Sequence, residues 1–222
     1  LFQDNGKSLA HRGSMPKIYF GKSNTEDKYC AQNVLLQVFF QDREFFSEED
    51  QDEEEKRMKK LIDSKILKPE KKCNFTALLG ALETILKSKY KEMKHYNQMD
   101  ANKKKQTEIL YGIIPKLLNE GKTQKNHKVR NIIYTNNKQG NFSNLLFWDD
   151  GLYGNGPTIY NLDSSLPEKK INKPISTKRA FKLLRMSKEF IVVYEKREVT
   201  KEFEDFVKNI YEMYRNREDL EN

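Results

Sequence analysis

The spacing of apolar residues changes once along this chain, and that change limits the folds open to it. Between residue 30 and about residue 119, apolar residues recur at intervals of three and four, as on one face of an α-helix. From residue 129 onward the chain carries short apolar runs rich in β-branched and aromatic residues, separated by turns that contain Asn and Gly. Helices followed by hairpin-connected strands predict an α+β fold with an antiparallel sheet.

The helical part is expected to contain four helices, at residues 30–41, 47–60, 74–86 and 105–119. Ser47 and Asn74 precede the second and third of these, and both residue types are favoured N-caps. Pro115 should kink the fourth helix, since a proline removes one backbone hydrogen bond, and Gly121 is a natural residue to end it.

The second part of the chain is expected to supply the sheet. Strands are predicted at residues 129–134, 143–148 and 189–195, with a further short strand near the start of the chain, at residues 17–20. A loop rich in Gly and Asn covers residues 151–157, and residues 163–176 are polar and should be irregular. Short helices are expected at residues 177–186 and, closing the chain, at about residues 199–217.

Composition and length bound the function. Residues 1–14 resemble a tag remnant, so we expect one domain over residues 15–222 of the 222. No apolar run has transmembrane length, and only two cysteines occur, which favours an intracellular, reducing location, cytoplasmic or nuclear. The net charge of +8 permits nucleic-acid binding, but the lysines are interleaved with acids, which favours a solvated surface. We expect no metal and no cofactor.

Cys30 stands at a chemically favourable position. A polar loop, residues 21–28, leads to it, and a helix-compatible apolar run follows at once. The first turn of a helix offers unpaired backbone N–H groups and the positive end of the dipole, both of which stabilise a thiolate. A thiolate is the nucleophilic form of cysteine. The alternative is that Cys30 is a small core residue, as buried cysteines often are.

His127 and Asp149 complete a possible catalytic set. His127 precedes the strand expected at 129–134, and Asp149 follows the next strand. A hairpin places the start of one strand beside the end of its partner, so these two residues can be neighbours. If the Cys30 helix packs on this sheet, a nucleophile, a base and an orienting carboxylate come together.

These segments resemble the ubiquitin-specific proteases, which are papain-like cysteine peptidases. The cysteine box of that family, roughly C-Y-x-N-x-x-L-Q-x-x-F, is similar to Cys30-x-x-Asn33-x-x-Leu36-Gln37-x-x-Phe40. The segments 127–134 and 145–150 resemble the family's histidine box, and 187–197 resembles its closing strand. The resemblance runs in order over most of residues 21–197, although the family's long fingers region and its zinc-binding cysteines have no counterpart here.

The resemblance implies a papain-like fold in which Cys30 is the nucleophile, His127 the general base and Asp149 the orienting residue. Asn24, displaced by one residue from the family's position, would be the oxyanion donor. The implied activity is a deubiquitinase-type peptidase that cleaves after the C-terminal glycine of ubiquitin or a ubiquitin-like modifier. Two alternatives remain open: another papain-like Cys-His-Asp protease or acyltransferase, and a catalytically dead interaction module. Cys73 is expected to be a bystander.

Overall fold

A computed structural model describes the parts of the chain that carry the fold. These parts are residues 30–40, 52–53, 56, 60, 74–90, 95, 97–101, 104, 114–117, 127–135, 141–148, 158–171, 173–187, 189–196, 205, 208–209 and 212. Within them the elements follow one another as helices, then strands, with short helices between the later strands. The chain therefore has an α+β fold, as its apolar spacing predicts.

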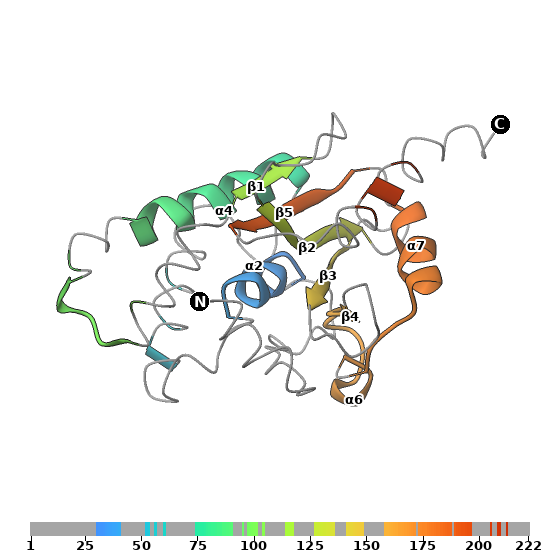
Figure 1. The fold of residues 1–222 in the computed structure, drawn as a ribbon, viewed down its shortest axis with the longest axis horizontal. Coiled ribbons are helices and arrows are strands. Elements are labelled where there is room, and N and C mark those ends of the chain that lie inside the picture. The colour runs from blue at the N-terminus through green and yellow to red at the C-terminus, as the bar shows by residue number, and fades with distance from the viewer. Residues whose placement is uncertain are drawn as a thin grey trace.

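A five-stranded antiparallel sheet forms the centre of the fold (Figure 1). Its strands are β1 (Ile114–Leu117), β2 (His127–Thr135), β3 (Phe142–Trp148), β4 (Thr158–Asn161) and β5 (Ile191–Lys196). The order across the sheet is β1-β5-β2-β3-β4, so the last strand inserts between β1 and β2. The three strands that resemble the histidine box and the closing strand, β2, β3 and β5, are thus neighbours in one sheet.

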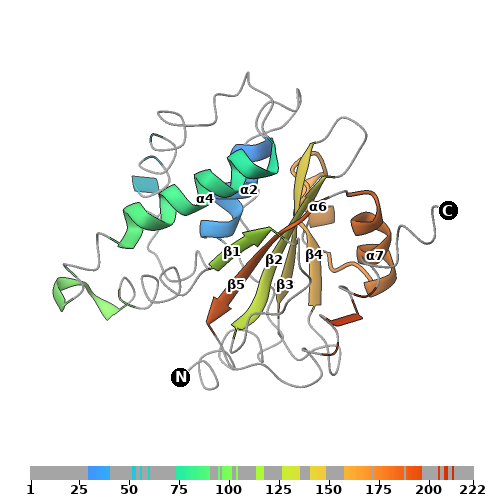
Figure 2. The same cartoon turned by 90° about the horizontal axis from the view of Figure 1, so that it is seen from above.

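Helices cover both faces of this sheet (Figure 2). Helices α2 (Cys30–Phe40) and α4 (Phe75–Tyr90) lie on one face, and α7 (Thr177–Arg185) lies on the other. Alternate residues along β5 pack against the helices on the two faces of the sheet, because successive strand residues point to opposite faces. Ile191 and Val193 pack with α2 and α4, whereas Phe190, Val192 and Tyr194 pack with α7. The sheet is therefore buried on both faces between two helical layers.

Local sequence explains where α4 and α7 begin. The Asn74 side chain accepts a hydrogen bond of 2.8 Å from the backbone N–H of Ala77, which satisfies a group that the first turn of α4 leaves unpaired. Ser176 caps α7 in the same way, accepting from the Arg179 N–H at 3.1 Å. The sequence placed both of these helix starts within one residue.

One predicted helix is wrong in its last part. Residues 105–119 were expected to be helical through Pro115, but Ile114–Leu117 form β1, an edge strand paired with β5. Proline disfavours a helical conformation at the residue before it, and it has no N–H to give to a ladder. At the edge of a sheet that missing donor costs nothing, so the same residue that was expected to kink a helix fits the strand.

β4 and the short helix α6 (Glu168–Ile171) were not anticipated. The four residues of β4 pair with the end of β3, from Leu145 opposite Asn161 to Trp148 opposite Thr158. The α6 helix has only four residues, within the stretch expected to be irregular. Elements of four residues are too short to show a periodic spacing of apolar residues, and the residues that they contact lie elsewhere in the chain.

Several other predictions fall partly or wholly outside the described residues. The strand at 17–20 lies outside them. Of the closing helix at about 199–217, residues 205, 208–209 and 212 are described, and these are helical and exposed. In the helix expected at 47–60, the described positions 52, 53, 56 and 60 are helical and exposed. Among the described helices none combines the length and the apolar character that a membrane crossing requires.

Candidate active site

Cys30 is the first residue of α2, as the sequence predicts. Its side chain is half-buried, carries a reduced thiol and packs against the apolar cluster that α2 and α4 form over the sheet. The residues after it, Ala31 through Phe39, are all buried. The thiol therefore occupies the position at which the core gives way to the surface, on the first turn of a buried helix.

Two polar residues of the cysteine box are also buried in α2. Asn33 and Gln37 are each 1% exposed, although amides rarely lie so deep. The Gln37 side chain donates a 2.9 Å hydrogen bond to the backbone carbonyl of Leu162, and the Leu162 N–H in turn donates to the carbonyl of Asn144 in β3 at 2.8 Å. Gln37 thus ties α2 to the segment that follows β4, and so to the end of the sheet at which β3 begins.

A buried arginine contacts α2 one residue further on, in its last turn. Arg130 of β2 is 1% exposed, and its guanidinium donates a 3.0 Å hydrogen bond to the carbonyl of Val38. Carbonyls in the last turn of a helix have no partner within the helix, so this bond satisfies a group that would otherwise be orphaned. Glu195 of β5 supplies a counter-charge, with 4.0 Å between its carboxylate and the guanidinium.

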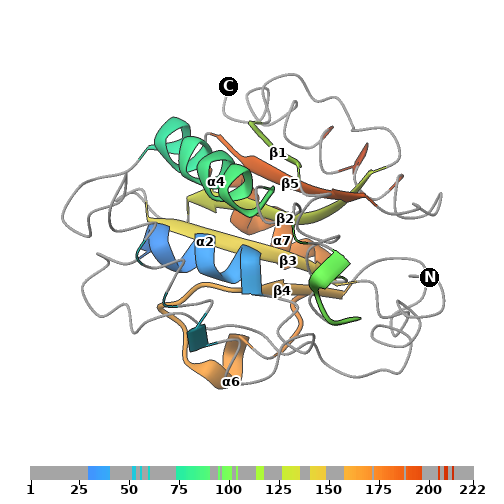
Figure 3. The ribbon, with the colours of Figure 1, turned by 90° about the vertical axis from the view of Figure 1, so that its left-hand side faces the viewer.

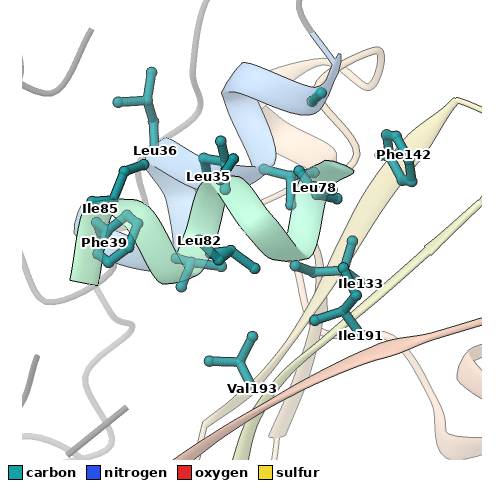
Figure 4. Close-up of a cluster of buried hydrophobic side chains, with 14 of the residues drawn as sticks. Leu35, Leu36, Phe39, Leu78, Leu82, Ile85, Ile133, Phe142, Ile191 and Val193 are labelled. Carbon is teal, nitrogen blue, oxygen red and sulfur yellow. The ribbon is translucent and has the colours of Figure 1, made fainter. Parts of the chain in front are cut away.

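The order of the buried side chains of α2 gives the direction in which the helix crosses the sheet. In Figure 4, Leu35, Leu36 and Phe39 follow one another away from Phe142, so the first turn of α2 lies on the Phe142 side. The bond between Arg130 and Val38 accordingly joins the last turn of α2, rather than its first, to the first half of β2. Figure 3 shows α2 lying along β3.

His127 begins β2 at the opposite end of the sheet. Its backbone pairs with Lys196 of β5, while the last residue of β2, Thr135, pairs with Phe142. Eight steps along a strand span about 26 Å. The first turn of α2 lies on the Phe142 side, away from the start of β2. The pairing of the Cys30 thiol with the His127 imidazole stays a prediction, because the His127 side chain lies outside the described residues.

The hairpin half of the expected triad has the backbone arrangement that the sequence predicts. β2 and β3 pair antiparallel, with Asn131 opposite Leu146, so the start of β2 and the end of β3 at Trp148 lie at one end of the sheet. The His127 side chain, Asp149 and Asn24 lie outside the described residues, as does Cys73. The pairing of His127 with Asp149, and the oxyanion role of Asn24, remain predictions.

Buried polar residues lie between α2 and the sheet, and sequence reasoning did not find them. The Asn131 side chain donates a 3.0 Å hydrogen bond to that of Asn144, and both residues are 0% exposed. Arg130 belongs to the same layer. A strand pattern marks its apolar positions clearly, but nothing in it separates a polar residue that faces water from one whose partner lies on another element.

No group of three or more His, Cys, Asp or Glu side chains that could hold an ion occurs in the part of the chain that the structure describes.

Comparisons of the chain with protein-family models, with curated proteins and with solved structures find no match. Function must therefore be argued from the residues themselves.

Proposed function

We propose that this chain is a papain-like cysteine peptidase of the ubiquitin-specific type, acting on ubiquitin or a ubiquitin-like modifier. The observation that carries the proposal is the one sheet in which β2, β3 and β5 are neighbours, because it assembles the segments that resemble the histidine box and the closing strand. The buried helix that begins at Cys30, with Asn33 and Gln37 held inside, adds support from the cysteine box.

The chemistry would follow from three side chains. The Cys30 thiolate attacks the carbonyl carbon of the modifier's C-terminal glycine, and the tetrahedral oxyanion is stabilised by the Cys30 backbone N–H and by Asn24. His127 takes the thiol proton and returns it to the departing amine, leaving a thioester. Water, deprotonated by His127, then releases the modifier's carboxylate and regenerates the thiol. Asp149 orients the imidazole and balances its charge.

This mechanism sets a structural requirement. The first turn of α2 must lie at the end of the sheet where β2 begins, so that Sγ of Cys30 comes within hydrogen-bond reach of the His127 ring. With α2 crossing in the direction described above, the last turn occupies the nearer position instead. A protein held in that arrangement would have no triad.

That direction of α2 favours a second candidate function. A ubiquitin-specific-protease-like chain whose cysteine and histidine stay apart would serve as a non-catalytic interaction module. It would share the fold and the buried helix, and it would form no thioester.

A ubiquitin probe with a C-terminal propargyl or vinyl-sulfone group decides between these functions. The peptidase is expected to form one covalent adduct with the probe, and Cys30→Ala should abolish it while Cys73→Ala leaves it intact. An adduct that persists in Cys30→Ala, or no adduct with ubiquitin or with ubiquitin-like probes, would refute the proposal. If peptide or acyl substrates are turned over instead, the chain is one of the other Cys-His-Asp enzymes.

Two neighbouring aspartates, Asp149 and Asp150, allow the role of the orienting carboxylate to be tested. Successive strand residues point to opposite faces, so only one of Asp149 and Asp150 can face His127. Asp149→Asn should lower kcat/KM on a fluorogenic ubiquitin substrate by about 10⁴-fold, as loss of the orienting carboxylate does in comparable triads. Asp150→Asn is the matched control and should have a much smaller effect. A larger loss of kcat/KM in Asp150→Asn would mean that Asp150, rather than Asp149, faces His127, so that the expected register of the second strand is wrong by one residue.

A further inference from the structure

The segment from α6 to the end of α7 wraps around the β4 edge of the sheet. On one side, Ile171 of α6 packs with Trp148 and Tyr160. At the edge, Ile175 forms an isolated antiparallel bridge with Ile159 of β4, and its N–H donates to the Ile159 carbonyl at 2.8 Å. On the other side, α7 packs against the opposite face of the sheet through the buried residues Ala180, Leu183 and Leu184.

This segment carries most of the excess positive charge of the protein. The whole chain has 41 basic and 33 acidic residues, a net charge of +8, and residues 169–187 contain seven of those basic residues and no acidic one. The expectation that the lysines are interleaved with acids is therefore wrong for this segment. We call these seven residues the basic band: Lys169, Lys170, Lys173, Lys178, Arg179, Lys182 and Arg185.

All seven side chains of the basic band are exposed. Among the described residues, no carboxylate forms an ion pair with any of them. Ile171, Ala180, Leu183 and Leu184 of the same segment are buried, so the packing of α6 and α7 leaves the charged residues outside. On α7, Lys178, Lys182 and Arg185 recur at intervals of four and three, which places them along one outer face of the helix.

We propose that the basic band binds the phosphate backbone of nucleic acid, without sequence preference. The composition of the surface decides between possible anionic partners. Surfaces that bind nucleic acid are far more positively charged than surfaces that bind proteins, whose centres are rich in aromatic residues and poor in lysine. Five of the seven residues in the band are lysines, and no exposed aromatic side chain occurs on α6 or α7.

A membrane surface fits the same band less well. Peripheral helices bind a bilayer by inserting large apolar side chains between the headgroups. Met186 is the only large apolar side chain that is exposed among the described residues, at 57%. The band therefore offers charge with almost nothing to insert, which suits a phosphate backbone that remains in water. This proposal does not rest on the proposed peptidase activity, since none of the seven residues of the band has a role in the proposed triad.

The test is fluorescence anisotropy with two labelled probes of arbitrary sequence, a duplex DNA and a single-stranded RNA, each measured over a range of salt concentrations. The wild-type chain should bind both, with an affinity that falls steeply as salt rises. The variant Lys178→Gln/Lys182→Gln/Arg185→Gln should lose at least about tenfold in affinity at low salt. Its plot of log K against log salt should also be less steep, by roughly one for each phosphate contact removed.

A matched variant controls for net charge. Lys56→Gln/Lys60→Gln/Lys87→Gln removes the same three charges from exposed positions away from the band, and it should bind within about twofold of wild type. Equal losses in the two variants would overturn the proposal, because overall charge would then explain the binding. Failure of wild type to bind either probe would overturn it as well. Binding to vesicles of phosphatidylserine and phosphatidylcholine without binding to nucleic acid would assign the band to a membrane instead.

Discussion

Arg130 is the residue on which the position of α2 depends most directly. Its guanidinium is buried, bonds the Val38 carbonyl at the end of α2 and faces the Glu195 carboxylate. A buried charge that has lost one partner is strongly destabilising, and an orphaned carbonyl adds to that cost. Three elements, α2, β2 and β5, therefore meet at this one side chain.

Arg130→Met should lower the free energy of unfolding by about 3 kcal/mol, measured by denaturant titration. The methionine fills much of the space but leaves the Val38 carbonyl and the Glu195 carboxylate without the guanidinium. Arg185→Met is the matched control, because Arg185 is exposed, and should stay within about 0.5 kcal/mol of wild type. An unchanged or increased stability in Arg130→Met would mean that desolvation of the guanidinium outweighs its contacts.

Tyr134 gives the protein a distinct dependence on alkaline pH. Burial raises the pKa of its phenol well above the ordinary value, although neighbouring hydrogen bonds oppose that shift. Its hydroxyl donates a 2.9 Å hydrogen bond to the Asn161 side chain. Because desolvation of the buried phenolate outweighs the opposing effects, the folded state favours the protonated form. The unfolded chain releases this proton near pH 10, and the folded protein retains it.

The free energy of unfolding should therefore fall as pH rises above about 10, by up to roughly 1.4 kcal/mol per pH unit from this group alone. Tyr134→Phe should cost about 1 kcal/mol near pH 8, through the lost hydrogen bond. Because the phenylalanine cannot titrate, the difference between the two proteins should shrink and then reverse above pH 10. Parallel stability curves for the two proteins at alkaline pH would contradict this account.

At the scale of elements, α7 shows how much depends on a single cap. The helix has nine residues, too few to persist alone in water, so its cap and its packing on the sheet must hold it. Ser176→Ala removes the hydrogen bond to the Arg179 N–H and should destabilise the protein by about 1 kcal/mol in denaturant unfolding. Thr177→Ala, next to it and exposed, should change stability by less than about 0.5 kcal/mol. Equal effects would mean that Ser176 does not act as the cap.

The elements also show which features of the fold could be read from sequence. α2, α4, α7, β2, β3 and β5 were predictable because each combines a clear apolar period with a cap or a turn nearby. β1 was not, since Pro115 fits a kinked helix as well as an edge strand, and only pairing with β5 decides between them. The Arg130 contact with Val38 joins residues far apart in the chain, so no local sequence pattern could have predicted it.

At the scale of the whole molecule, the direction of α2 across the sheet separates the two proposed functions. The sequence places a cysteine at the start of a buried helix and a histidine at the start of a strand, and both placements are correct at the level of the backbone. Neither placement fixes which end of the helix faces the histidine. That choice depends on how the whole helix packs on the sheet, and the contacts of Gln37 with Leu162 and of Arg130 with Val38 anchor only its C-terminal half.

A nitroxide on Cys30 would measure this direction in solution. The variant Cys73→Ser leaves one thiol to label, and the unpaired electron broadens amide signals more strongly the closer they lie. With α2 oriented as described, the signals of Phe142 and Ser143 should lose far more intensity than those of Val129 and Arg130, relative to the same sample after chemical reduction of the nitroxide. The reverse pattern would place the first turn of α2 beside the start of β2, where the Cys30–His127 pair could form. Because the label sits on the proposed nucleophile, a single spectrum tests the structural requirement of the peptidase without depending on its substrate.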